Sequence, residues 1–148
     1  MSLRSNYKTD RKLEAEGKWI KVGYNADLKK DIRIKLARAG GANPAHTKAM
    51  EEFYEPVQAD LAAGKLSQEQ QQEISRKIFV KADLKDWEGV TKFDITGKDE
   101  DRLTEIKYTQ ADALALFEEM PDLFDNWESR SLRMATFLES AKEDAAKN

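Results

Sequence analysis

The chain has 148 residues, 25 basic and 28 acidic side chains, a formal net charge of -3, one histidine and no cysteine. This length suits one domain, residues 1–148, whose core needs no disulfide or structural metal. The lack of cysteine excludes disulfides and thiol nucleophiles, and one histidine cannot form a histidine cluster for a transition metal. We therefore expect no catalytic, cofactor or metal site and no enzymatic activity. The apolar runs are far shorter than the roughly 18 residues of a membrane span, and the N-terminus lacks an apolar signal core, so we expect no membrane partner.

The first 39 residues predict an arm followed by a β-hairpin. Residues 1–17 are polar and end in a glycine, which is typical of a loosely ordered arm or a short helical turn. Residues 18–39 contain two apolar-rich segments, and the second alternates strictly in the order Ile32, Arg33, Ile34, Lys35, Leu36. This pattern predicts a two-stranded antiparallel hairpin. An isolated hairpin is marginal in water, so later helices must cover its apolar face.

The next segment predicts a bent helix. Asn43 is a good N-cap residue, and Pro44 suits the first helical position. Apolar residues then recur at three- and four-residue spacing until Gly64 ends the helix. Pro56 removes one backbone donor inside this pattern, which predicts a bend near Glu55.

A second helix and a connection follow. Ser67 and Gln70 have the spacing of a capping box, and the helix that they begin is predicted to run to about Lys85. The connection after it is polar. Within it, residues 103–108 alternate weakly, which indicates a short extended segment.

Two more helices complete the predicted chain. Thr109 caps the third helix, and Pro121 begins the fourth, which is expected to be the longest. The tail 139–148 has no apolar side chain larger than alanine and is expected to fray. The predicted fold is therefore α+β and mostly helical, with an N-terminal two-stranded β-hairpin packed on about four helices in the region 43–148.

Charge is unevenly distributed along the chain. Residues 1–50 carry 12 basic and 5 acidic side chains, a net charge of +7, whereas residues 51–100 carry 7 and 12 and residues 101–148 carry 6 and 11, a net charge of -5 each. Such a basic third could attract nucleic acid, another protein or a second copy of the chain. It lacks the aromatic-basic motif of nucleic-acid binders, so solvated charged faces are the simpler interpretation.

The sequence does not match the motif of a calcium-binding loop or of a phosphate-binding loop. The acidic cluster at residues 94–101 lacks the glycine and the ligand spacing of a calcium loop, and Gly40-Gly41 is not followed by a phosphate-binding pattern. His46 has no nearby partner along the chain, so we expect an exposed polar residue without a role. Most aromatic residues are expected in the core, unless several of them form an exposed patch for a partner.

Several short motifs nevertheless follow one another in a characteristic order. They are residues 16–20 (EGKWI), 38–40 (RAG), 86–90 (DWEGV), a turn at 97–98 (GK), 106–109 (IKYT), 113–116 (ALAL) and 120–125 (MPDLFD). In order and spacing this series resembles the tail assembly chaperones of long-tailed bacteriophages and prophages. The resemblance covers most of the chain.

The resemblance implies a non-enzymatic protein that binds the tape measure protein, keeps it soluble and helps to recruit tail tube protein. It also implies a location in the cytoplasm of the infected or lysogenic bacterial host and absence from the mature virion. Such families commonly make a longer product by ribosomal frameshifting. If the codons of residues 146–148 spell a slippery heptamer, a frameshifted longer form of this chain is a further partner.

A protein that binds a helical client needs an apolar or aromatic groove and charges that steer association. The candidate contact or groove-forming residues are Trp87, Phe117, Phe124, Trp127, Arg33 and Lys35. Trp87 and Trp127 are equally good candidates for the core.

Two other functions stay open. One is a structural tail or head-tail connector component of the virion, in which a basic β part binds the acidic helices of the next copy, so that the protein is an oligomer. The other is a nucleic-acid-binding protein, for which the candidate residues are Lys29, Lys30, Arg33, Lys35 and Arg38. Nucleic acid is not the expected partner.

Overall fold

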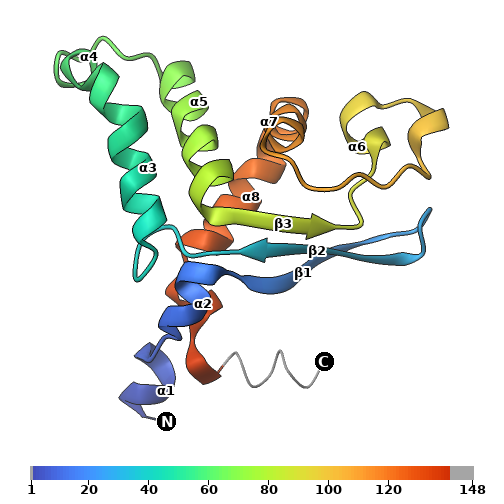
Figure 1. The fold of residues 1–148 in the computed structure, drawn as a ribbon, viewed down its shortest axis with the longest axis horizontal. Coiled ribbons are helices and arrows are strands. Elements are labelled where there is room, and N and C mark those ends of the chain that lie inside the picture. The colour runs from blue at the N-terminus through green and yellow to red at the C-terminus, as the bar shows by residue number, and fades with distance from the viewer. Residues whose placement is uncertain (1, 141–148) are drawn as a thin grey trace.

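A computed structural model describes residues 2–140 and shows a three-stranded antiparallel sheet with helices packed against one face (Figure 1). In chain order the elements are α1 (Leu3–Tyr7), α2 (Arg11–Glu16), β1 (Lys18–Asn25), β2 (Lys30–Leu36), α3 (Pro44–Tyr54), η1 (Glu55–Val57), α4 (Gln58–Ala62), α5 (Gln68–Ile78), η2 (Phe79–Asp83), β3 (Leu84–Glu88), α6 (Lys92–Thr96), η3 (Asp99–Asp101), α7 (Gln110–Glu119), α8 (Pro121–Leu132) and η4 (Met134–Phe137). The predicted α+β class, with its N-terminal hairpin and about four main helices, is confirmed.

The hairpin pairs as its alternation predicts. β1 and β2 are antiparallel, with Lys18 opposite Leu36 and a bulge between Lys21 and Gly23. Ile34 and Leu36 are fully buried on the face that the helices cover. The core therefore lies between this face of the sheet and the helices α5, α7 and α8.

The third strand is the main departure from the predicted elements. The second helix was expected to run to about Lys85, but α5 ends at Ile78, a π-helical turn (η2) follows, and β3 begins at Leu84. β3 pairs antiparallel with β2, and the register shifts between Lys35 and Leu36. Because this pairing joins segments far apart in the chain and includes a bulge, no local alternation marks the strand.

Local signals placed most helix boundaries. Pro44 begins α3, and the 3₁₀ turn at Glu55–Val57 forms the predicted bend. Both hydrogen bonds of the capping box between Ser67 and Gln70 are present, and the Thr109 hydroxyl accepts from the Asp112 backbone. The fourth helix, α8, is the longest α-helix of the described residues at 12 residues. It ends at Leu132 and not near residue 138, because the chain turns extended at Arg133 before η4.

The N-terminal segment takes the helical alternative, as two short helices. Backbone bonds join its middle to the end of the described chain: the Asp10 N–H donates to the Phe137 carbonyl at 2.9 Å, and the Glu139 N–H donates to the Lys8 carbonyl at 2.8 Å. Residues 139 and 140 are thus tied to the arm, whereas the rest of the predicted frayed tail and the codons at 146–148 lie outside the described residues.

Within residues 2–140, no helix is both long enough and apolar enough to span a membrane.

Candidate functional site

The four aromatic residues selected from the sequence lie in the core and not on a surface. Trp87, Phe117, Phe124 and Trp127 are 3 %, 0 %, 4 % and 3 % exposed. The Phe117 ring contacts the rings of Phe124 and Trp127 at centroid distances of 5.2 and 5.8 Å, and Trp87 Nε1 donates to the Ile106 carbonyl at 3.0 Å. For Trp87 and Trp127 this is the core alternative. Phe117 and Phe124 were expected as contact or groove-forming residues, and their burial corrects that expectation, because their rings pack against each other and against neighbouring core rings beneath any contact surface.

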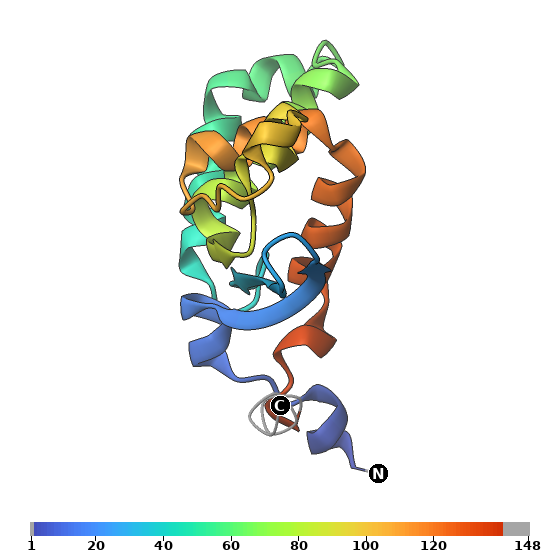
Figure 2. The ribbon, with the colours of Figure 1, turned by 90° about the vertical axis from the view of Figure 1, so that its right-hand side faces the viewer.

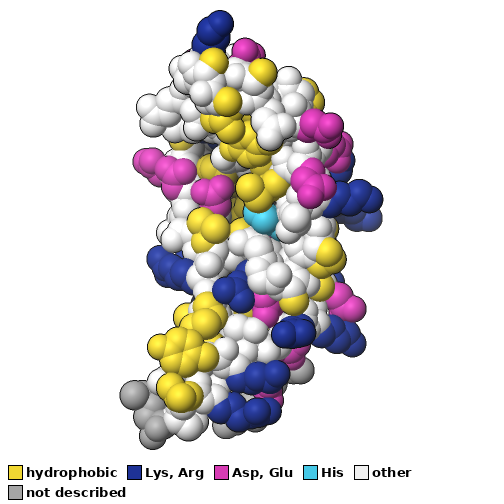
Figure 3. All heavy atoms as spheres, turned by 90° about the vertical axis from the view of Figure 1, so that its left-hand side faces the viewer, with side chains coloured by type: hydrophobic (Ala, Val, Ile, Leu, Met, Phe, Trp, Pro, Cys, Tyr) yellow, Lys and Arg dark blue, Asp and Glu magenta, His cyan; other side chains and the backbone are white. Residues whose placement is uncertain are grey.

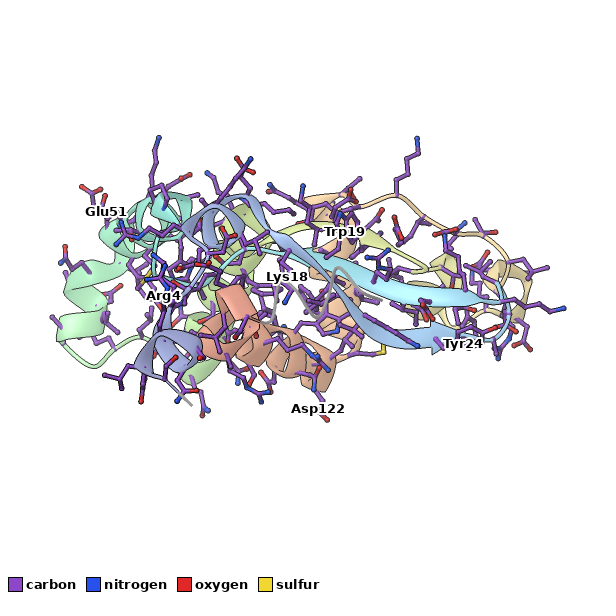
Figure 4. All side chains as sticks on the ribbon, turned by 90° about the horizontal axis from the view of Figure 1, so that it is seen from below. Arg4, Lys18, Trp19, Tyr24, Glu51 and Asp122 are labelled. Carbon is purple, nitrogen blue, oxygen red and sulfur yellow. The ribbon has the colours of Figure 1, made fainter. Side chains whose placement is uncertain are left out.

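Arg33 and Lys35 lie on the uncovered face of the sheet. Their neighbours across the pairing on β3 are Glu88 and Asp86 respectively. On the other side Trp19 of β1 (Figure 4) is opposite Lys35. The Arg33 guanidinium lies 5.7 Å from the Trp19 ring centroid. This face therefore mixes both charges, because the acidic strand β3 completes a sheet whose first two strands are basic.

Two further cations of the nucleic-acid alternative are also paired with carboxylates. Lys30 Nζ lies 3.0 Å from a Glu105 oxygen, and Arg38 lies 3.0 Å from Glu14. Binding of phosphates requires cations that can neutralise them, and each of these two already neutralises a carboxylate. Lys30 and Arg38 therefore contribute less unpaired positive charge to this part of the chain than the sequence alone indicates.

A groove between helices is the surface feature best suited to a partner. A hollow of about 170 Å³ lies between α3, α5 and α8, and its apolar lining consists of Met50, Tyr54, Ile78, Leu132 and Ala39. A second hollow, of about 350 Å³, adjoins it, since Tyr54 lines both, and it extends along α3 to Leu61 of α4. We call the two hollows together the α3 groove. Figure 3 shows apolar side chains gathered around the histidine on this face.

The way the helices pack leaves apolar side chains exposed along this groove. Met50 and Leu132 are 43 % and 56 % exposed, although both continue the apolar pattern of their helices. The reason is that α3 packs on α5 and η2, while α8 packs on α7 and η4, which leaves the groove between α3 and α8 uncovered. Apolar periodicity predicts the helices but cannot tell which apolar side chains find a neighbour.

At the floor of the groove His46 has a partner, so the expectation of an unpartnered exposed residue is wrong. His46 Nδ1 lies 3.0 and 2.9 Å from the two carboxylate oxygens of Asp83, which is buried. Asn43 Nδ2 also donates to Asp83, at 3.3 Å, and to the Ala82 carbonyl at 3.1 Å. The missed partner lies on η2, far along the chain, so no spacing near His46 could reveal it.

Burial and charge shift the pKa values of this cluster. The hydrogen bond to Asp83 raises the pKa of His46, and the nearby Glu128 acts in the same direction, against the effect of burial. Burial raises the pKa of Glu128, and the negative charges of Asp125 and Asp83 raise it further. Burial also raises the pKa of Asp83, which the hydrogen bonds from His46 and Asn43 oppose.

The hydrogen bonds of the cluster join His46 to Asp83 and Asn43 to Asp83. Ser75 lines the same hollow, but among the described residues no hydrogen bond joins its hydroxyl to His46. Within the same part of the chain no group of three or more acidic or histidine side chains could hold a metal ion. The geometry fits a structural pair that positions η2 against α3.

Apart from His46, whose charge depends on pH, the charged residues that line the α3 groove are acidic. Its acidic lining residues are Glu51, Glu55, Asp83 and Glu128. Among the described residues that line it there is no lysine or arginine. An open apolar surface beside exposed acidic side chains such as Glu51 and Glu55 favours a partner that presents apolar side chains flanked by basic ones.

A family model described as YdaY prophage protein matches residues 41–148. The match covers more than half of the chain and includes every residue that lines the α3 groove except Ala39. No curated protein and no solved structure matches the chain.

Proposed function

The chain belongs to the YdaY prophage protein family, and from this premise we propose that it is a non-enzymatic tail assembly chaperone that binds the tape measure protein. The α3 groove carries the proposal, because it is an open apolar surface of the kind that receives an amphipathic helix. The resemblance of the motif series to tail assembly chaperones supplies the identity of the client.

The groove suits a helical client in shape and in chemistry. Its two hollows follow α3 and α4 and share Tyr54, so a client helix that lies along them can place an apolar side chain in each. Met50, Leu132 and Leu61 offer apolar surface that is exposed in the free chain, and covering it stabilises a complex. The acidic border favours client segments that carry lysine or arginine beside their apolar seam.

Co-expression tests this proposal. The tape measure protein encoded by the same prophage is produced alone, with the chain, and with a variant that carries Met50→Glu and Leu132→Glu. We expect the chain to increase the soluble tape measure protein and the groove variant to lose this effect, because both charges would enter the apolar contact. The matched control is Leu103→Glu, an exposed leucine outside the groove, which should act like the unchanged chain. If the groove variant increased the soluble tape measure protein as much as the unchanged chain does, the proposal would be contradicted.

The proposed chaperone recruits tail tube protein and then leaves the tail. Mass spectrometry of purified virions separates it from the alternative of a structural tail or connector component. Absence of the chain from virions agrees with a chaperone, whereas a fixed copy number in each particle would favour the connector.

A further inference from the structure

We propose that, in the absence of a client, the N-terminal arm (residues 2–12) of one copy docks into the α3 groove of a second copy. The inference uses the groove of the proposed function but does not depend on the client. It assigns a function to the arm, which precedes the region of the family match.

The arm presents an apolar face that no other part of residues 2–140 covers. Leu3 and Tyr7 are 79 % and 64 % exposed, and α1 contains no buried residue. The two side chains are four residues apart on one helical turn and so lie on the same side of α1. A pair of large apolar groups projecting from one helix is a typical anchor for a groove.

The backbone contacts of residues 8–10 hold the arm away from the α4 end of the groove in its own chain. Thr9 pairs with Leu138 in a β-bridge, and the backbone bonds on either side fix residues 8 and 10 to residues 139 and 137. From this base α1 extends to one end of the molecule, whereas α4 lies at the opposite end (Figures 1 and 2). Docking therefore involves a second copy.

The charges of arm and groove are complementary. Residues 2–12 contain four basic side chains, at Arg4, Lys8, Arg11 and Lys12. Their single acidic side chain, Asp10, accepts from the backbone of α2 as its N-cap. Acidic residues line the groove. Figure 3 shows basic side chains around the arm and acidic ones beside the apolar hollow.

The size of the groove also fits. An apolar cavity of about 150 Å³ holds a benzene ring. The hollow of about 170 Å³ beside His46 can therefore receive the Tyr7 ring or the Leu3 side chain, while the adjoining hollow receives the other. Because arm and groove are different surfaces, two copies can dock reciprocally as a dimer, with each arm in the groove of the other copy, or several copies can dock head-to-tail in a ring or an open chain. A client helix in the groove would displace the arm.

The oligomeric state tests the inference. Sedimentation velocity compares the unchanged chain with a variant that carries Leu3→Asp and Tyr7→Asp. We expect the unchanged chain to self-associate and the variant to do so at least about tenfold more weakly, because two charges enter the apolar contact. The matched control carries Tyr24→Asp and Leu103→Asp, which are 59 % and 72 % exposed outside the arm and groove, and should associate normally. Circular dichroism checks that each variant is folded.

Cross-linking tests the docking site itself. The chain has no cysteine, so a chain with Tyr7→Cys mixed with one carrying Met50→Cys can form a mixed disulfide only through the introduced thiols. We expect this mixed dimer on oxidation, and no comparable product when Tyr24→Cys replaces Tyr7→Cys. A monomeric unchanged chain, normal association of the arm variant, or absence of the mixed dimer would overturn the inference.

The outcomes separate this inference from the proposed function. The arm variant leaves the groove intact, so it should still increase the soluble tape measure protein. If the chain self-associates through its arm but never affects the tape measure protein, the chaperone proposal fails and the inference stands. If the unchanged chain is monomeric yet solubilises the tape measure protein, the inference alone fails.

Discussion

Glu14 is a buried carboxylate that joins three separate parts of the chain. It accepts hydrogen bonds from the Thr9 hydroxyl, from Arg38 at 3.0 Å and from the Ala42 backbone N–H at 2.9 Å. Burial alone would raise its pKa, but these hydrogen bonds and the positive charge of Arg38 outweigh burial and lower the pKa below 4.5. The side chain thereby fixes α2 to the segment between β2 and α3.

Replacing Glu14 should lower the stability of the fold. We expect Glu14→Ala to lower the free energy of unfolding by about 3 kcal/mol, because it leaves Arg38 and a backbone donor without their acceptor. The lowered pKa means that the contribution is present above pH 4.5 and is lost as the pH falls through the folded-state value. Urea unfolding measures both effects. Glu16→Ala, at an exposed position of the same helix, is the control, and an equal loss in both variants would contradict the assignment.

His46 provides a second pH dependence, with the opposite sign. Since Asp83 raises the pKa of His46 above 6.5, protonated His46 stabilises the fold fully below that pH, and the contribution is lost as the pH rises through the raised value. We expect the difference in unfolding free energy between the unchanged chain and His46→Gln to shrink over this rise. An NMR titration of this single histidine measures the pKa directly, and a value at or below 6.5 would contradict the pairing.

Among the structural elements, β3 depends on Gly89, because this residue allows the chain to turn beside the hairpin at the end of the strand. Its φ is +81°, and a Cβ added there would lie 2.7 Å from the Asp31 carbonyl oxygen. Its N–H donates to Glu105 at 2.8 Å, and its carbonyl accepts from Asn25 at 3.2 Å. The turn therefore connects the third strand to the tip of the hairpin and to the loop that precedes α7.

Gly97 supplies a matched comparison for Gly89. It also has a positive φ, of +70°, but no atom lies within 4 Å of an added Cβ. We expect Gly97→Ala to lower the free energy of unfolding by about 1 kcal/mol through backbone strain alone. Gly89→Ala should lower the free energy of unfolding by at least about twice as much, because the added Cβ must also displace backbone atoms of β2. Thermal or urea unfolding of both variants tests this, and equal losses would show that the close approach is unimportant.

Elements with local signals could be predicted from the sequence, and those that depend on distant contacts could not. The alternation around Ile34, the capping box at Ser67 and the proline at position 44 each act within a few residues. β3 depends on pairing with β2, and the partner of His46 comes from another helix. Both require the folded chain.

The candidate site was harder to predict than the fold for a related reason. The same apolar side chains serve a core and a contact surface, so Trp127 and Leu132 on one helix look alike in the sequence, yet only Leu132 is exposed. The neighbouring helices decide which of them is covered. Similarly, the basic pattern at Arg33 and Lys35 gave no sign of the acidic strand that completes the sheet.

At the scale of the whole molecule, the sheet and the outer helices have different roles. The sheet and the rings packed on it form the core, whereas the outer sides of α3 and α8 leave an acidic, apolar groove open. The basic arm lies at one end of the molecule, on a base formed with residues 137–139. An exposed groove and a complementary arm suit a protein that exchanges contacts with its own copies for contacts with a client.

Hydrogen–deuterium exchange of the chain, with and without the tape measure protein of the same prophage, tests the chaperone proposal most directly. We expect slower exchange in α3 and α8 when the tape measure protein is present, because the client covers the α3 groove, and little change in β1. The variant carrying Met50→Glu and Leu132→Glu should show no such protection. Unchanged exchange along α3 and α8 in the presence of the tape measure protein, or protection confined to the outer face of the sheet, would contradict the proposal.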